Sequence, residues 1–387
     1  MRSLAIFLLI LLVIVGGVFA FLVFTTPHQS ADFHARLDAI SQVPASAQWF
    51  AIIPTAAALD AKLQANPVTR AAIERWRANQ PLPKPWMIGG ADLIVWKSGD
   101  AIRYFIRVDP FRGVIVRTFL TTGNVMINVQ PEQPLDTTTA AQIAQLASKL
   151  PPGDALVVQR ENARGSYPPI SRPSVTSVQV TPAEVRLTSV AAGFSPPGPS
   201  EGLKAAAPLD FPKSAILSVG FKSPPRLIAD LNRLFGTKVS DLLGGGGMLC
   251  IYNVDTRKFL PRPLGVIVLP DSPQRRAEIG SIANTATKDG NLLVSFDRDS
   301  IGQYQNDTFE PAAAGNEWTA RIDPPRLVPI LNALKDSVGL RILAPRLYRS
   351  ARDLEGWISG LEQAKVIDAS DSVDATGETL RVRIPAK

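Results

Sequence analysis

The longest run of apolar positions lies at the N-terminus, where residues 4–24 carry no charged or strongly polar side chain. At about 1.5 Å per residue, a helix over this run is about 31 Å long, close to the ~30 Å hydrocarbon thickness of a bilayer. A helix also satisfies its own backbone hydrogen bonds, as lipid requires. The pattern predicts a transmembrane helix within residues 1–27 and a juxtamembrane linker over residues 28–42.

A cleaved signal peptide is the alternative for the same run. Val18, Phe19 and Ala20 have the small-x-small pattern of a cleavage site, but apolar residues continue as far as Phe24. The apolar core of a signal peptide is shorter, about 7–15 residues, so we expect an uncleaved signal anchor. Arg2 precedes the helix, and the positive-inside rule then places the bulk of the chain outside the cytoplasm.

Beyond residue 42, short apolar or alternating runs predict strands, and leucines spaced three or four apart predict helices. The predicted strands cover residues 47–53, 91–97, 101–108, 124–129, 155–159, 174–180, 184–191, 214–221, 247–254, 264–269, 291–296, 317–322, 366–373 and 378–384. The predicted helices cover residues 55–79 with a break at Pro67, 137–149, 224–243, 273–286, 324–336 and 345–363.

This order of elements predicts an α+β fold. Each half of the chain begins strand–helix–strand–strand–helix–strand, which is the split βαβ order. Residues 194–207, rich in proline and glycine, are predicted to link domain 1 (residues 43–193) to domain 2 (residues 208–387). We expect a duplicated split-βαβ-like ectodomain whose mixed or antiparallel sheets are covered by helices.

Two segments of the second half repeat one another. The segments that begin at Ser223 and Asp323 share Pro-Pro-Arg-Leu, then Leu-Asn, then Leu, at equal spacing. Serine or aspartate accepts a backbone N–H at a helix N-cap, and proline loses nothing at the first helical position. Each segment therefore predicts a capped turn that opens a helix, and Asp109 to Arg112 is a more distant copy.

A resemblance to a known family follows from these features. The apolar anchor, the proline-led strand starts at Pro44 and Pro212, and the glycine-led strand from Gly247 to Tyr252 resemble an uncharacterised bacterial family of membrane-anchored envelope proteins with a domain of unknown function. The resemblance implies a place in the cell envelope. It implies no activity and no catalytic residue.

The charge limits the expected binding partners, and the cysteine content limits the expected cellular compartment. The net charge is +7, but the basic residues are scattered, and no aromatic-interleaved basic stripe of a nucleic-acid-binding sheet is present. We therefore expect no nucleic-acid partner, and anionic lipid or an acidic protein fits the charge better.

Cys250 is the only cysteine, so no intrachain disulfide can form, and we expect it to be a small buried hydrophobe. This agrees with a bacterial inner-membrane protein whose bulk lies in the periplasm.

The residues needed for common catalytic sites are scarce. His28 and His34, the only histidines, lie close to the predicted membrane surface. The folded part then has no histidine for a catalytic triad or a zinc site. Residues 244–247 are four glycines that follow a predicted helix and open a strand, the reverse of a phosphate loop. We expect no catalytic residue, no cofactor-binding residue and no metal site.

Aspartates and arginines remain as candidate binding residues. Asp297, Asp299, Asp368 and Asp371 offer oxygen ligands for a hard cation, but we expect them in solvated turns. Two sets of arginines are candidate surfaces for an anionic partner. Arg346, Arg349 and Arg352 recur every third residue on one predicted helix, and Arg112, Arg226 and Arg326 begin equivalent helices. A solvated helix face is the alternative for the first set, and exposed first-turn positions without a ligand for the second.

Three functions are compatible with this sequence. The first is a non-enzymatic, membrane-anchored extracytoplasmic protein that binds a protein partner as a scaffold or accessory subunit in the cell envelope. The alternative is a periplasmic carrier of lipid or another hydrophobic ligand. The third is an envelope enzyme that depends on carboxylates.

Overall fold

The structure is a computed structural model. It describes residues 37, 40, 43–79, 92–98, 101–107, 125–127, 133–160, 174–191, 210–221, 246–257, 259, 261–312, 318–343, 355–374 and 377–387. The chain forms two compact units: unit 1 comprises Met1–Ala65 and Arg77–Val180, and unit 2 comprises Asn66–Trp76 and Thr181–Lys387. These limits differ from the predicted domains 43–193 and 208–387, because the strand that begins at Glu184 pairs with the last strand of the chain.

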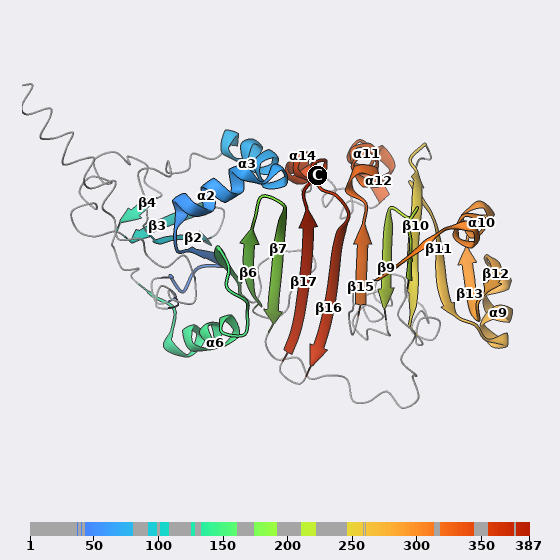
Figure 1. Ribbon diagram of the computed structural model, residues 1–387, viewed down its shortest axis with the longest axis horizontal. Coiled ribbons are helices and arrows are strands. Elements are labelled where there is room, and N and C mark those ends of the chain that lie inside the picture. The colour runs from blue at the N-terminus through green and yellow to red at the C-terminus, as the bar shows by residue number, and fades with distance from the viewer. Residues whose placement is uncertain are drawn as a thin grey trace, which may run out of the picture. The chain divides into compact units, whose positions relative to one another are not determined.

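Unit 1 is built on a mixed sheet (Figure 1). Its elements are β1 (Trp49–Ile53), α2 (Ala56–Ala65), β2 (Asp92–Ser98), β3 (Ala101–Arg107), β4 (Val125–Ile127), α6 (Thr137–Ala147), β5 (Ala155–Gln159) and β6 (Ser174–Val180). The strand order is β6-β5-β1-β2-β3-β4, with every neighbouring pair antiparallel except β3 and β4.

Strand alternation places one face of this sheet in the core. Phe50 lies opposite both Trp96 and Val158, and Val158 lies opposite Val175. All four side chains are almost completely buried, and together they form a continuous apolar row across four strands. Helix α6 buries Ile143, Leu146 and Ala147, and it begins at Asp136, whose side chain accepts a hydrogen bond from the Thr139 N–H.

Unit 2 contains a longer antiparallel sheet. Its elements are β7 (Glu184–Ala191), β8 (Asp210–Pro212), β9 (Leu217–Phe221), β10 (Gly247–Asp255), β11 (Arg262–Pro270), α9 (Pro273–Gly280), β12 (Asn284–Lys288), β13 (Asn291–Ser295), α10 (Arg298–Asn306), β14 (Phe309–Pro311), β15 (Trp318–Ile322), α11 (Pro324–Lys335), α12 (Val338–Leu343), α14 (Glu355–Leu361), β16 (Ile367–Asp374) and β17 (Gly377–Pro385). The strand order is β12-β13-β11-β10-β9-β15-β16-β17-β7, and β8 and β14 form a separate two-stranded sheet.

The sheets of the two units have the same spatial order over five strands, and this order is not the predicted split βαβ order. In unit 1 the order β6-β5-β1-β2-β3 corresponds to β16-β15-β9-β10-β11 in unit 2. The split βαβ expectation is wrong for both units, because β1 pairs directly and antiparallel with β2, and β9 with β10. A split βαβ unit would instead place another strand between two parallel ones. The α+β class and the mixed or antiparallel sheets are confirmed.

Both faces of the unit 2 sheet are covered near β13. On one face Leu293 packs with Met248, Cys250 and residues of α10. On the other face Leu292 and Val294 pack with Ile279 of α9. Cys250 is fully buried, as the sequence predicted. The strand is therefore apolar at successive positions rather than at alternate ones.

Helix α3 (Pro67–Asn79) contributes its first residues to unit 2. The Asn66 side chain accepts from the Val68 N–H at 2.9 Å and donates to the Thr181 carbonyl at 2.8 Å. Val68 packs with Ala364, Ile367 and other buried residues of unit 2. The start of the helix therefore belongs to the core of unit 2, although β1 and α2, which precede it in the chain, belong to unit 1.

Most predicted elements are present within the described residues, and several assignments are corrected. The break at Pro67 is confirmed, as is the capped helix at Asp323. The helix predicted over 273–286 ends at Gly280, and β12 follows it. Helices α10 and α12 and strands β8 and β14 were not predicted. The helix predicted over 224–243 lies outside the described residues.

The predicted anchor lies at residues 1–27, where the structure describes nothing. Among the helices that it does describe, none combines the length and the apolar character needed to cross a membrane.

Candidate functional site

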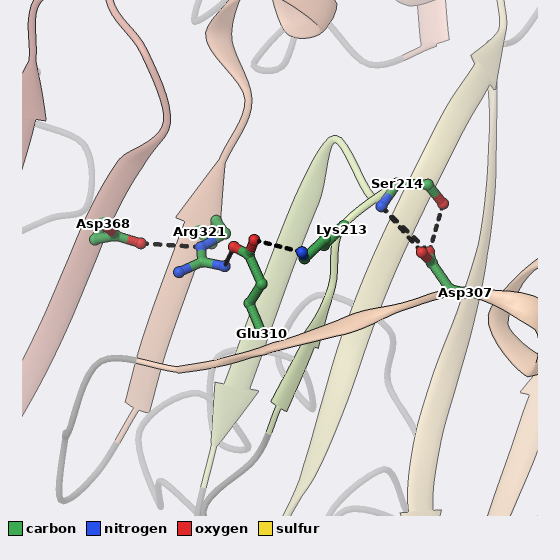
Figure 2. Close-up of polar contacts among 6 residues, drawn as sticks. All are labelled: Lys213, Ser214, Asp307, Glu310, Arg321 and Asp368. Atoms are coloured by element: carbon green, nitrogen blue, oxygen red, sulfur yellow. Dashed lines mark hydrogen bonds and ion pairs between the residues drawn. The ribbon is translucent and has the colours of Figure 1, made fainter.

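A chain of ion pairs joins the β8–β14 sheet to the main sheet of unit 2 (Figure 2). The Lys213 Nζ lies 3.0 Å from Glu310 Oε1, and the Arg321 Nη1 lies 2.8 Å from Glu310 Oε2. The Arg321 Nε lies 3.1 Å from Asp368 Oδ1. Two cations therefore face two carboxylates.

The local strands fix the position of each charge. Glu310 on β14 lies opposite Phe211 on β8, and Arg321 on β15 lies opposite Asp368 on β16. The Arg321 guanidinium is also 5.9 Å from the centre of the Phe211 ring, within reach of a cation–π contact. The Arg321 side chain is only 19% exposed, whereas that of Glu310 is 45% exposed. Arg321 is therefore the more buried partner of this ion pair, and Glu310 is the more exposed one.

The network is electrostatically balanced. The hydrogen bond from Lys213 is the main cause that lowers the pKa of Glu310, and Arg321 adds to it. No charge is left in excess, and each carboxylate already has a partner. We conclude that the network attaches the β8–β14 sheet to β15 and β16, a structural role that leaves little capacity for a ligand.

Replacement of Glu310 by glutamine is expected to lower stability by less than about 1 kcal/mol at pH 7, since the pair is half exposed. The folded-state pKa of Glu310 is lowered, so its contribution is present above the unfolded value of 4.5 and is lost as the pH falls through the folded value. The difference between wild type and Glu310→Gln in urea unfolding should then vanish in acid. A difference that persists there would show that packing, not charge, is responsible.

A second polar contact closes the turn after β8. The Asp307 carboxylate accepts from the Ser214 backbone N–H at 3.2 Å and from the Ser214 hydroxyl. The Gln303 side chain donates to that hydroxyl at 3.2 Å, and the Arg326 guanidinium donates to the Ser214 carbonyl. The arrangement holds a turn.

Cys250, Tyr252 and Tyr304 have potentially reactive side chains and are buried in the same core cluster as Phe211. Burial raises the pKa of Cys250 to about 12, and burial also raises the pKa of Tyr252 and of Tyr304. The nearest polar contact of the Cys250 sulfur is the Ser218 hydroxyl at 3.9 Å. All three therefore stay protonated near neutral pH, which disfavours nucleophilic chemistry.

The predicted arginine surfaces are only partly described. Arg326 begins α11 as predicted and is exposed, and its guanidinium is bound to the Ser214 carbonyl. The other five lie outside the described residues, namely Arg112, Arg226, Arg346, Arg349 and Arg352.

The predicted turn aspartates occupy regular structure instead. Asp297 is the N-cap of α10, where its side chain accepts from the N–H groups of Asp299 and Ser300. Asp368 and the buried Asp371 lie within β16. The solvated-turn expectation is wrong for these residues, because helix capping and strand pairing determine their positions. Within the described ranges, no group of three or more histidine, cysteine or acidic side chains is placed to hold a metal ion.

One surface of unit 2 was not anticipated from the sequence. The described residues include six large apolar side chains that are exposed: Phe259, Ile282, Phe296, Val338, Ile342 and Val366. All six lie at one end of the unit 2 sheet, which we call the apolar end. The antiparallel pairing shows this for four of them, and Figure 1 places α12, which carries Val338 and Ile342, at the same end.

The termini of the paired strands identify this end of the sheet. β10 ends at Asp255 where β11 begins, and β13 ends at Ser295 where β12 begins. Antiparallel neighbours bring these termini to one end of the sheet. Ile322 at the end of β15 lies opposite Leu217 at the start of β9, and β9 runs antiparallel to β10, so both termini point toward the end where β10 finishes. Val366 precedes β16 at this end, since Ile322 also pairs with Ile367.

Sequence reasoning missed the apolar end because its residues are scattered over more than a hundred positions. A faint signal was present: Phe259 stands in a polar, turn-rich segment, and Phe296 is the last residue of a predicted strand, next to Asp297. Comparison of the chain with family models, with curated proteins and with solved structures finds no match.

Proposed function

We propose that this protein is a non-enzymatic, membrane-anchored component of the cell envelope that acts by binding, with the apolar end of unit 2 as its contact surface. The observation that carries the proposal is the gathering of the exposed large apolar side chains of the described residues at one end of one sheet. Single exposed apolar residues are ordinary, but six of them at one end of one sheet favour a binding role for that end.

The backbone around these side chains supports the proposal. The Phe296 carbonyl accepts from the Arg262 guanidinium at 2.7 Å, and the Ile282 N–H donates to the Ile279 carbonyl at 2.9 Å. The two side chains are 71% and 70% exposed. They are held out by hydrogen-bonded backbone, and such preorganised contact residues reduce the entropic cost of binding.

The polar network supports the same reading from the other direction. Its charges are matched within the protein, and the Ser214–Asp307 contact closes a turn. These polar groups serve the fold, which leaves the apolar end as the candidate contact surface. We further propose that the shared five-strand order of the two sheets reflects duplication of one α+β unit, which would give a scaffold two related bodies.

Photo-crosslinking in native membranes tests the proposed contact surface. A photoreactive phenylalanine analogue is introduced at Phe296 of the full-length protein, where the native ring is already exposed. Gln274, exposed on the first turn of α9, is the control, because α9 begins at the opposite end of the sheet. We expect a discrete adduct, to protein or lipid, from position 296 only. Equal labelling from both positions, or none from position 296, would contradict the proposal.

A further inference from the structure

Half of the apolar end combines exposed apolar side chains with arginines. Phe259 lies in the β10–β11 connection, Ile282 lies between α9 and β12, and Phe296 follows β13. Arg257, Arg262 and Arg298 lie in or beside the same connections. Each connection therefore presents one large apolar side chain at the same end of the sheet, with arginines interspersed.

The acidic residues in these connections are largely committed to local contacts. Asp255 accepts from the Arg257 Nε at 3.1 Å, and Asp297 accepts from the N–H groups that open α10. Asp299 lies in the first turn of α10, where a negative charge meets the positive end of the helix dipole. The Arg257 side chain is still 91% exposed, so its remaining N–H donors face solvent.

We infer that this side of the apolar end, formed by Phe259, Ile282, Phe296 and the three arginines, rests in the headgroup region of a phospholipid bilayer. The inference rests on the proposed function and names the partner of its contact surface. The rings and the isoleucine would enter the boundary between headgroups and acyl chains, and the guanidinium groups would donate hydrogen bonds to lipid phosphates.

A bilayer fits these side chains better than a protein partner does. Protein interfaces draw their energy from a contiguous, fully desolvated cluster at the centre of the contact. Here the apolar side chains come from three separate connections with charged residues between them. A fluid interface accommodates separate insertions of this kind. The predicted anchor covers residues 1–27 and β1 begins at Trp49, so an anchor there would keep the folded units close to lipid.

The test places an environment-sensitive fluorophore at the surface of the full-length protein. Phe296→Cys and the control Gln274→Cys are labelled separately with the dye NBD and reconstituted in nanodiscs of phosphatidylcholine and phosphatidylglycerol. The native Cys250 is fully buried, with its pKa raised to about 12, and should not react. Thermal unfolding verifies that each variant is folded.

We expect a blue-shifted emission at position 296 and quenching by spin-labelled lipid several-fold stronger than at position 274. Arg257→Gln combined with Arg298→Gln should reduce that quenching, because both guanidinium groups would lose their phosphate contacts. Equal and weak quenching at the two positions would overturn the inference. If position 296 nevertheless crosslinks to a protein in native membranes, the proposed function stands without a lipid contact; if it crosslinks to nothing, both are overturned.

Discussion

Gly265→Ala is expected to destabilise unit 2 by about 3 kcal/mol, a large part of the roughly 5–15 kcal/mol that stabilises a typical domain. A Cβ atom at this position would lie 2.2 Å from the Cys250 carbonyl oxygen and 3.1 Å from the Ile251 Cα. Both contacts are to backbone, so no flexible side chain can turn aside. The strands β10 and β11 would have to separate in the centre of the sheet.

The sheet itself explains the close approach at Gly265. The pairing of β10 with β11 shifts register between Ile251 and Asn253, next to Gly265. The Gly265 carbonyl also accepts from the Ser295 hydroxyl at 2.7 Å, which ties the position to β13. A bulge of this kind brings two backbones closer than a side chain allows.

Gly302→Ala is the matched control for Gly265→Ala. Gly302 lies in α10, and a Cβ atom there would meet nothing within 4 Å. Alanine in an open helical position should stabilise the protein by about 0.5–1 kcal/mol. Urea unfolding followed by circular dichroism measures both variants. Similar stabilities for the two would refute the steric account of Gly265.

Asn66→Ala is expected to cost about 2–3 kcal/mol and to release the start of α3 from unit 2. The fully buried side chain performs two tasks. Its oxygen caps the helix through the Val68 and Thr69 N–H groups, and its amide nitrogen donates to the Thr181 carbonyl. Alanine removes the cap and leaves that carbonyl without its donor. Hydrogen exchange over residues 67–76 and thermal unfolding would measure the loss.

Asn66→Ser separates the two tasks of this side chain. Serine is a good N-cap but has no amide to donate to Thr181, so it should recover about half of the lost stability. Gly360 lies on the other side of the same contact, where a Cβ atom would be 2.8 Å from the Val68 carbonyl oxygen. If Asn66→Ala leaves exchange over residues 67–76 unchanged, the packing at Gly360, not Asn66, holds α3 in place.

Gly265 and Asn66 both support segments that carry exposed residues of the apolar end, so their substitution should also affect the proposed binding. Gly265 sets the spacing of β10 and β11, whose connection carries Phe259. Asn66 fixes α3 against the residues that precede β16, close in sequence to Val366. Loss of either should weaken crosslinking from the apolar end together with stability. A surface variant such as Phe259→Ser should weaken crosslinking from position 296 without a loss of stability, because its ring is 60% exposed.

Local patterns in the sequence were sufficient to identify most of the elements. The repeat Asp-Pro-Pro-Arg predicted a capped helix, and Asp323 does accept from the Arg326 N–H. Pro67 marked the break between two helices. Capping, proline geometry and strand alternation act over a few residues, so they can be read without knowledge of the fold. The short strands β8 and β14 were missed because three residues carry too little pattern.

The sequence by itself determined the α+β class, the capped helix start at Asp323 and the burial of Cys250, and it predicts the anchor at residues 1–27. Only the tertiary structure decided which strands pair, that α3 belongs to unit 2, and that Phe259 and Phe296 share one end of a sheet. Pairing and clustering depend on contacts between residues far apart in the chain. Local propensity does not encode these contacts, and the packing of the whole unit fixes them.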